Sequence, residues 1–255
     1  MRLFQRRLLL LLIFATIFQQ CNGFSVLQNP LSFLQNALAP NKVPDFVDNT
    51  SCVINNQEIQ QVAKFFTESF WTRKGEQVLA DSQFQLVYSS QISEFRKSYP
   101  LPKSFTTYGN SNEKSKLFVC RTKEKEICGC IGVQMSKIDD IKNDGYAIEA
   151  PVISDVVVGY NFRRMKLAEY LVRFIHDYIL EEWGCNSVYL YVHESNTPAV
   201  KLYKKMGYEV ISKDLNGQVM RVNERGGITA VSASILCMRK SLRRILLYHF
   251  CRVAI

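Results

Sequence analysis

Strand-like and helix-like segments alternate between residues 151 and 212 in an order that restricts the fold severely. A valine-rich run over 152–158 is typical of a central strand that is buried on both faces. A long helix with one apolar face is predicted over 166–183, followed by a strand over 187–192 and a helix over 197–206. A helical connection between neighbouring strands favours a parallel pair, so this stretch predicts a βαβ unit.

The flanking segments extend this unit to one mixed α/β domain over 51–242. We therefore expect an α/β fold with a mixed central sheet of about six or seven strands, flanked by helices. Asn56 is expected as the N-cap of the first helix, and Gly129 and Gly132 indicate a bulge or close packing. The flanking elements are the helices 57–71 and 83–99 and the strands 52–54, 116–120, 127–135, 208–212 and 234–239.

Composition and motifs argue against several classes of protein. The formal charge is +9, yet no dense Lys/Arg stripe with interleaved aromatic residues is present, so no nucleic-acid partner is expected. The eight cysteines form neither a CxxC pair nor a Cys/His cluster, so we predict buried free thiols and no metal site. The sequence also lacks GxGxxG, Walker and HExxH motifs, which argues against a nucleotide-binding fold and a zinc protease.

The N-terminus predicts a signal peptide over 1–23. Three arginines precede an apolar run over 8–18, and small residues at Cys21 and Gly23 suit a cleavage site. This run is shorter than the about 20 residues that a membrane span needs, although an uncleaved signal anchor is the alternative. Residues 24–44 contain no acidic residue, so 24–50 is interpreted as a transit-like or linker segment.

A signal peptide followed by a transit-like segment that opens with Phe24 resembles the bipartite leaders of algae with complex plastids. This resemblance implies a plastid (chloroplast) location, with the secretory pathway as the alternative. The tail over 243–255 mixes arginines with large apolar residues, which suits either contact with a membrane surface or packing on the domain. Membrane contact is therefore expected only through the leader or the tail.

Basic residues accompany the connection between the valine-rich strand and the long helix. Arg163, Arg164 and Lys166 lie where free backbone N–H groups and the helix dipole favour an anion such as a pyrophosphate. An ordinary connection with solvated basic residues is the alternative.

The helix 197–206 carries a second group of residues. Asn196 stands where the strand ends and the helix begins, and Pro198 suits a first turn. Ala199 leaves room for a ligand or a strand, and Tyr203 lies one turn later on the same face. Gly207 suits a left-handed C-cap. Taken alone, Tyr203 would be interpreted as a core tyrosine.

Together the two groups resemble the motifs of the GNAT superfamily of N-acetyltransferases. The first family motif is Arg/Gln-x-x-Gly-x-Gly/Ala, and 163–168 matches it except at Lys166, where the family usually has glycine. The second is Asn-x-x-Ala-x-x-Leu-Tyr-x-x-x-Gly-Phe/Tyr, and 196–208 matches every fixed position. The resemblance covers 51–242 and implies a GNAT fold with a splay between strands 152–158 and 187–192.

The resemblance further implies acetyl-CoA as the acetyl donor and a role for each matching residue. The strand backbone would pair with the pantetheine arm, the loop and helix start would hold the pyrophosphate, and Asn196 would fix the cofactor. Tyr203 would act as general acid and protonate the departing CoA thiolate. The implied cofactor-binding residues are Val156, Val157, Val158, Arg163, Arg164, Lys166, Leu167, Ala168, Asn196, Ala199 and Tyr203.

Attack on the thioester requires a neutral amine, so a carboxylate or a chain of waters should accept its proton. Glu149 and Asp155 flank the entry to the central strand and are the nearest candidates for the base. His193 is a third candidate. A solvated or capping role suits each of these residues equally well.

In the family, the acceptor groove lies between the first two helices and the last hairpin, which here correspond to 70–84 and 213–231. The strand Tyr-Leu-Tyr-Val-His at 189–193, the helix end Leu-Tyr-Lys-Lys-Met-Gly-Tyr-Glu at 202–209 and the final strand Leu-Cys-Met-Arg-Lys at 236–240 resemble plastid GNATs of plants. That group acetylates protein N-termini and lysine side chains. We therefore predict a protein or peptide amine as the acceptor, attacked directly in a ternary complex. The aromatic residues that could line the groove are Phe70, Trp71, Tyr88 and Tyr208, and a place in the core is the alternative for each.

Two alternatives stay open. A small-molecule amine is the other class of acceptor. A non-catalytic CoA-binding regulator is the other class of protein, because Lys166 replaces the glycine that lets phosphate oxygens approach the backbone. The sequence does not indicate an oligomeric state.

Overall fold

The computed structural model describes residues 43–73, 76–77, 79–101, 114–139, 147–222 and 228–242. The predicted signal peptide 1–23, the part of the transit-like segment over 24–42 and the tail 243–255 lie outside these residues. Strand β1 (Val47–Cys52) starts inside the segment predicted as a linker, so the first strand precedes the expected domain boundary at residue 51.

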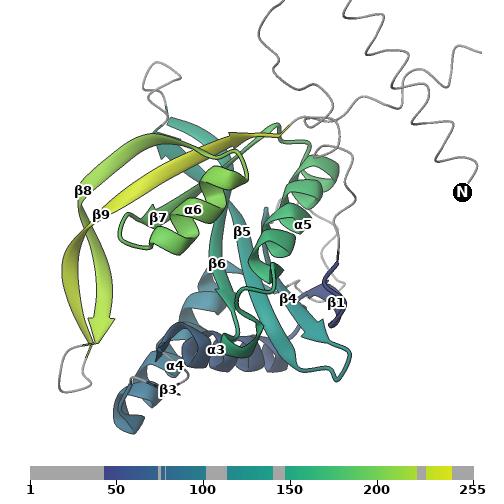
Figure 1. Ribbon diagram of the computed structural model, residues 1–255, viewed down its shortest axis with the longest axis vertical. Helices are drawn as coiled ribbons and strands as arrows, with labels where there is room; N and C mark the ends of the chain where they lie inside the picture. The colour runs from purple at the N-terminus through teal and green to yellow at the C-terminus, as the bar shows by residue number, and fades with distance from the viewer. Residues whose placement is uncertain are drawn as a thin grey trace, which may run out of the picture. The chain divides into compact units, whose positions relative to one another are not determined.

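Seven strands form one mixed sheet in the order β1-β4-β5-β6-β7-β9-β8 (Figure 1). Neighbouring strands are antiparallel except β6 and β7, which run parallel and are connected by α5. The sheet therefore confirms the predicted α/β class, the βαβ unit and the strand number. Besides β1, the strands are β4 (Ser115–Thr122), β5 (Ile127–Asp139), β6 (Ala147–Val158), β7 (Ser187–His193), β8 (Glu209–Val222) and β9 (Ile228–Ser241).

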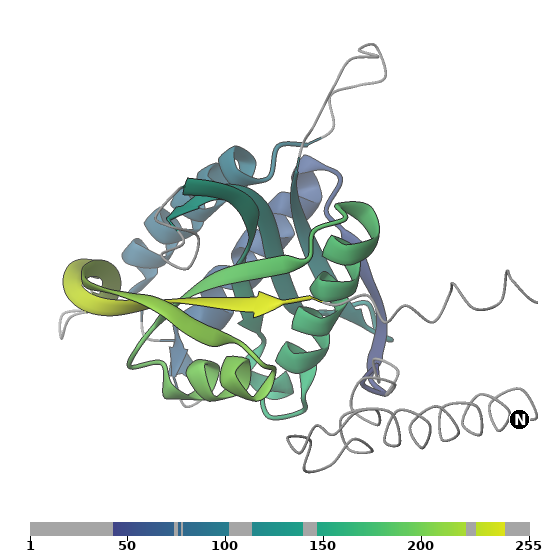
Figure 2. The same cartoon turned by 90° about the horizontal axis from the view of Figure 1, so that it is seen from above.

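Helices cover both faces of the sheet (Figures 1 and 2). Strand pleating sends neighbouring side chains of β4 to opposite faces, so Cys120 packs with α5 and Val119 with the first two helices. In β5, Cys128 and Cys130 also pack on opposite faces, because the pairing with β4 shifts register beside Cys128. A short hairpin of β2 (Thr72–Arg73) and β3 (Glu76–Gln77) connects those two helices. The helices are α3 (Asn56–Phe70), α4 (Asp81–Ser98), α5 (Leu167–Glu182) and α6 (Thr197–Lys205).

The N-cap of α3 is Asn55, and the prediction of Asn56 is wrong by one residue. The Asn55 side chain accepts a hydrogen bond from the Glu58 backbone N–H at 2.8 Å, and the Glu58 carboxylate accepts one from the Ile54 N–H at 2.9 Å. The first hydrogen bond satisfies an N–H group that the first turn of the helix leaves free, and the second satisfies the N–H group just before the cap. Two adjacent asparagines offer the same side chain, and only the backbone decides which one precedes the first turn.

Strands β8 and β9 are much longer than the predicted strands 208–212 and 234–239. Their ladder continues beyond the sheet to the pair Val222 and Ile228, with register shifts in β8 at Val210/Ser212 and Asp214/Gly217. Residues 212–218 in the middle of β8 are polar or glycine except Leu215, so the apolar alternation that identifies a strand is interrupted there. The result is a twisted two-stranded arm (Figure 1).

The two glycines of β5 mark close packing, as predicted. A Cβ at Gly129 would lie 2.9 Å from Leu171 of α5, and a Cβ at Gly132 would collide with the Tyr99 hydroxyl. Among the described residues, no helix is long and apolar enough to cross a membrane.

Candidate active site

Strands β6 and β7 separate where the GNAT resemblance implies a splay. They pair only at Val152 with Tyr189 and at Ile153 with Leu190, although β6 continues to Val158 and β7 to His193. On its other edge β6 stays paired with β5 as far as Val158. The backbone of Val156 to Val158 therefore borders the opening on the β7 side, as its predicted role beside a pantetheine arm requires.

The first turn of α5 lies after a tight loop that follows β6. The first intrahelical hydrogen bond joins the Tyr170 N–H to the Lys166 carbonyl at 3.0 Å, so the N–H groups of Leu167, Ala168 and Glu169 precede it. Such groups favour an anion. The negative charge of Glu169 repels such an anion only weakly, because the carboxylate pairs with Arg173 at 2.9 Å and with Lys205 at 3.0 Å.

Lys166 lies outside the helix that was predicted to include it. Its φ of 64° places it in the left-handed region, as the residue that precedes α5, and Arg164 has a φ of 66°. A Cβ makes this region unfavourable by about 1–2 kcal/mol, which is why glycine suits the position. The lysine therefore departs from the family motif at a position where the backbone itself selects glycine.

Arg163 is engaged by the protein's own backbone. Its guanidinium donates to the Ser69 carbonyl of α3 at 2.6 Å and to the Val158 carbonyl at 3.3 Å, and it lies over the Tyr160 ring. These contacts attach the loop to α3 and to the end of β6. The Arg163 side chain thus shapes the predicted pyrophosphate site, and Arg163, Arg164 and Lys166 are all exposed cations of the loop.

Helix α6 carries the second motif at the other border of the opening. Asn196 is its N-cap and accepts a hydrogen bond from the Ala199 N–H at 3.4 Å, and Gly207 ends the helix with a φ of 87°, as predicted. Tyr203 is 7% exposed. Burial raises the pKa of Tyr203 to about 12, so its hydroxyl keeps its proton at neutral pH. A general acid must hold a proton in this way.

Tyr208 lies in the core behind Tyr203 instead of lining an acceptor groove, so that expectation is wrong. Its hydroxyl contacts His176 Nε2 of α5 at 2.7 Å, and its ring packs edge-on against Tyr203 at 5.6 Å. Burial lowers the pKa of His176 to about 3, and the Lys240 and Arg173 charges act in the same direction. Sequence reasoning missed this pair, because His176 occupies a core position of an ordinary apolar helix face.

Of the three candidates for the base, Asp155 lies where the opening begins. It has a φ of 52° in a bulge of β6, where the pairing with β5 shifts between Cys130 and Gly132. The exposed Glu149 lies near the start of β6, opposite Lys137. His193 lies at the end of β7, where its Nδ1 contacts the Ser195 hydroxyl at 2.5 Å.

Two hydroxyl groups hold Asp155. Tyr99, which follows the last turn of α4, donates a short hydrogen bond to its carboxylate and also contacts the Ser154 hydroxyl at 2.7 Å. The bare Gly132 leaves room for the Tyr99 hydroxyl to cross β5. Burial raises the pKa of Asp155, the Tyr99 and Ser154 hydrogen bonds lower it, and the Glu94 charge raises it; the net effect is an increase.

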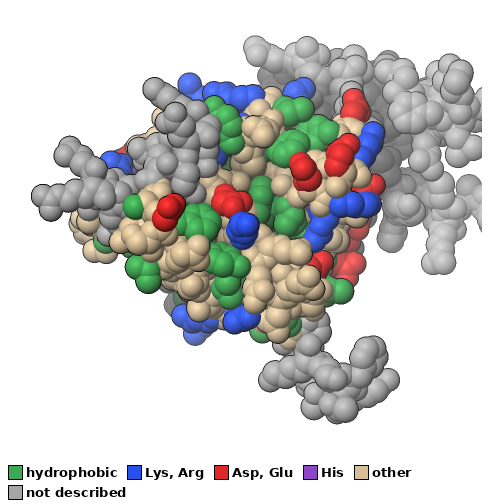
Figure 3. Space-filling model, turned by 90° about the horizontal axis from the view of Figure 1, so that it is seen from below, with side chains coloured by type: hydrophobic (Ala, Val, Ile, Leu, Met, Phe, Trp, Pro, Cys, Tyr) green, Lys and Arg blue, Asp and Glu red, His purple; other side chains and the backbone are tan. Residues whose placement is uncertain are grey.

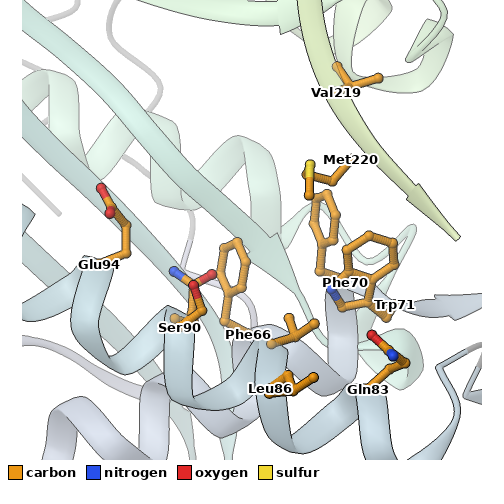
Figure 4. Close-up of a pocket in the computed structure, with 11 residues that line it drawn as sticks. Phe66, Phe70, Trp71, Gln83, Leu86, Ser90, Glu94, Val219 and Met220 are labelled. Carbon is orange, nitrogen blue, oxygen red and sulfur yellow. The ribbon is translucent and has the colours of Figure 1, made fainter. Parts of the chain in front are cut away.

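A groove of about 590 Å³ lies between the two helices α3 and α4 and strand β8 (Figure 4). Phe70 and Trp71 line it as predicted, whereas Tyr88 packs on Phe84 elsewhere on α4. The α4 residues of the groove recur at helical spacing. The sequence did not identify them as groove residues, because they mix polar and apolar side chains. The residues that line the groove are Phe66, Phe70, Trp71, Gln83, Leu86, Val87, Ser90, Gln91, Glu94, Val219 and Met220.

The groove is apolar along most of its length. Phe70, Leu86 and Met220 are each more than half exposed, and large exposed apolar side chains gathered in one place indicate a binding surface. Glu94 is the one charged residue among the described residues that line it, and it lies at the opposite end from Trp71 (Figure 4). Viewed from the side of α3 and α4, the surface mixes acidic and basic side chains with apolar ones (Figure 3).

The fold and the site together define an acyltransferase that uses acetyl-CoA. Residues 84–208 match the family model described as the acetyltransferase (GNAT) family. The chain is thus a member of the GNAT superfamily of acetyltransferases, as the two motifs indicated.

The chain is similar to several solved structures. A chimera of the spermidine N-acetyltransferase SpeG from Vibrio cholerae and hSSAT has a TM-score of 0.51 at 12% identity, over 76% of this chain and 94% of that one. The ribosomal-protein-S18-alanine N-acetyltransferase of Escherichia coli has a TM-score of 0.49 at 14% identity, over 78% and 98%. Naa20 of Chaetomium thermophilum, bound to a bisubstrate analogue, has 0.48 at 18%, over 76% and 87%. No curated protein sequence matches the chain.

Proposed function

We propose that this acetyltransferase acts on protein or peptide amines, at N-termini, lysine side chains or both, by direct attack in a ternary complex. The shape and lining of the groove between α3, α4 and β8 support this acceptor class. A long apolar surface suits a chain that carries apolar side chains next to its amine. A polyamine carries several cations, and Glu94 alone offers a negative charge among the described lining residues.

The proposed chemistry divides proton transfer between two residues on the two borders of the opening. Acetyl-CoA supplies the activated acyl group when it is bound. Asp155 accepts a proton from the acceptor ammonium, which frees the nitrogen lone pair for attack on the carbonyl carbon. Tyr203 gives its proton to the sulfur as the carbon–sulfur bond breaks. The second proton that the new amide nitrogen loses restores the Tyr203 hydroxyl, and Asp155 releases its proton to solvent.

The test is an acetylation assay by mass spectrometry on a panel of peptides and small amines. Wild-type protein should acetylate peptides with a higher kcat/KM than spermidine or other small amines. Tyr203→Phe should lower kcat by about 100-fold or more, because a positioned general acid contributes about that much. Tyr88→Phe removes a similar hydroxyl away from the groove and should leave kcat unchanged. Faster turnover of a small amine than of every peptide would refute the acceptor class.

We also propose that the leader directs the protein to the plastid of an alga with a complex plastid. The proposal rests on the signal-like residues 1–23 and the acid-free residues 24–44. A fluorescent protein fused behind residues 1–50 should accumulate in the plastid, and removal of residues 24–50 should divert it. Secretion of the intact fusion would contradict the proposal.

A further inference from the structure

The acceptor groove and the splayed strands are connected through one helix. Helix α4 presents Gln83, Leu86, Ser90 and Glu94 to the groove at helical spacing, and Tyr99 follows its last turn. Glu94 is therefore the groove residue nearest in sequence to the hydroxyl that holds Asp155. The Ser98 hydroxyl donates to the Glu94 carboxylate at 3.1 Å, which orients it.

Three features of the fold turn Asp155 toward the side of the sheet on which α4 lies. The β6 bulge, with its φ of 52° at Asp155, turns the carboxylate toward the face that α4 covers. The absent side chain of Gly132 lets Tyr99 cross β5. The pairing of β6 with β7 ends at Ile153, so Asp155 also lies at the start of the opening.

We propose that Glu94 binds the acceptor ammonium at the inner end of the groove, and that Asp155, held in place by Tyr99 and Ser154, removes its proton. The inference rests on the proposed function for its acceptor groove, but it applies to any cationic amine. Asp155 is the catalytic base, Glu94 is a binding residue, and Tyr99 and Ser154 are positioning residues. An ammonium between two carboxylates is attracted by both, and its neutral form is released toward the opening.

The titratable groups around Asp155 make the proposal sharply testable. Tyr99 and Glu94 face it from α4, and Cys130 faces it from β5, with its thiol 3.5 Å from the Asp155 carbonyl. The Tyr99 hydrogen bond stabilises the charged carboxylate, and the Glu94 charge destabilises it. Loss of the Tyr99 hydrogen bond should therefore raise the pKa of Asp155, and loss of the Glu94 charge should lower it.

The experiment measures kcat/KM against pH with the best acceptor from the panel of peptides and small amines. In Tyr99→Phe the acid limb of the profile should shift to higher pH. In Glu94→Gln it should shift to lower pH, and the KM of a cationic acceptor should rise about tenfold. Glu181→Gln removes an equal charge on the exposed face of α5 and should change neither quantity.

Asp155→Asn should lower kcat/KM at neutral pH by about 100-fold or more. The remaining kcat/KM should rise with pH as the acceptor amine loses its own proton in solution, because no base is left in the site to remove it. Thermal unfolding of each variant checks that the fold is intact. If Asp155→Asn does not fold, the opposite shifts in Tyr99→Phe and Glu94→Gln still carry the test.

Shifts in the same direction, or none, in folded Tyr99→Phe and Glu94→Gln would overturn the inference. Failure of the proposed acceptor class has a different signature. If the best acceptor proves to be a small amine, the opposite shifts are still expected with that amine, and only the assignment to protein acceptors falls.

Discussion

The burial of His176, which contacts Tyr208 in the core, makes the stability of the domain depend on pH. The His176 imidazole has an ordinary pKa of 6.5, and in the folded protein burial lowers it to about 3. Lys240 and Arg173 are the charged groups that act on it, and both disfavour the imidazolium. The neutral ring can share a proton with the Tyr208 hydroxyl at 2.7 Å, whereas the cation would be enclosed without a counter-ion from these partners.

The sign follows from the depressed pKa. Below pH 6.5 the unfolded chain binds a proton at His176 and the folded protein does not, so the free energy of unfolding falls as the pH falls. The contribution is fully present above the unfolded pKa and is lost between 6.5 and about 3. At pH 5 the loss is about 1.5 pKa units, or about 2 kcal/mol. For a domain of this size that corresponds to a fall of about 4–8 °C in Tm.

The assay is urea unfolding at pH 7, 6 and 5, for wild-type protein and His176→Asn. Other groups titrate in this range, but they contribute equally to both proteins, so the difference between the two curves isolates His176. The difference should shrink by about 2 kcal/mol from pH 7 to pH 5. Tyr208→Phe removes the hydrogen-bond partner and leaves the imidazole buried, so it should keep the pH dependence of the wild type. Parallel curves for wild type and His176→Asn would refute the reasoning.

Three further predictions concern single positions. Asn55→Ala should lower the free energy of unfolding by about 1 kcal/mol, through loss of the cap on α3; Asn56→Ala is the matched control in urea unfolding and should cost less. Lys166→Gly should raise the free energy of unfolding by up to about 1 kcal/mol because it relieves the left-handed strain, whereas Lys166→Ala should not. Equal effects of these two variants would contradict that explanation. Gly132→Ala should displace the Tyr99 hydroxyl and shift the acid limb of kcat/KM to higher pH, and an unchanged profile would show that Tyr99 does not tune Asp155.

Much of the site could be predicted from the sequence where function depends on local backbone. Gly207 ends α6 in the left-handed conformation, as its place after an amphipathic helix indicated. Tyr203 lies one turn after Ala199, so their shared face follows from helix geometry alone. The backbone also explains why Lys166 is strained: the residue has a positive φ, and the family motif has glycine at this position.

Predictions failed where a side chain's neighbours come from distant parts of the chain. Tyr208 was expected in the acceptor groove, but it packs on His176, which lies 32 residues away. The length of the β8–β9 arm was missed because residues 212–218 interrupt the apolar alternation of β8, whereas the backbone pairing continues past them. Glu94 was missed because nothing in α4 by itself separates a groove residue from a solvated one.

The order of elements and the residues of the two motifs were determined by the sequence alone, because periodicity and turn chemistry are properties of neighbouring residues. The splay between β6 and β7 followed only from the family resemblance that those motifs carry. Which carboxylate reaches the opening was decided only by the tertiary structure. Asp155 is positioned by a bulge, by a tyrosine from α4 that lies 56 residues away, and by the missing side chain of Gly132 that lets the two meet. The bulge, Tyr99 and Gly132 belong to different parts of the chain and meet only in the folded protein. Burial there raises the pKa of the Asp155 carboxyl.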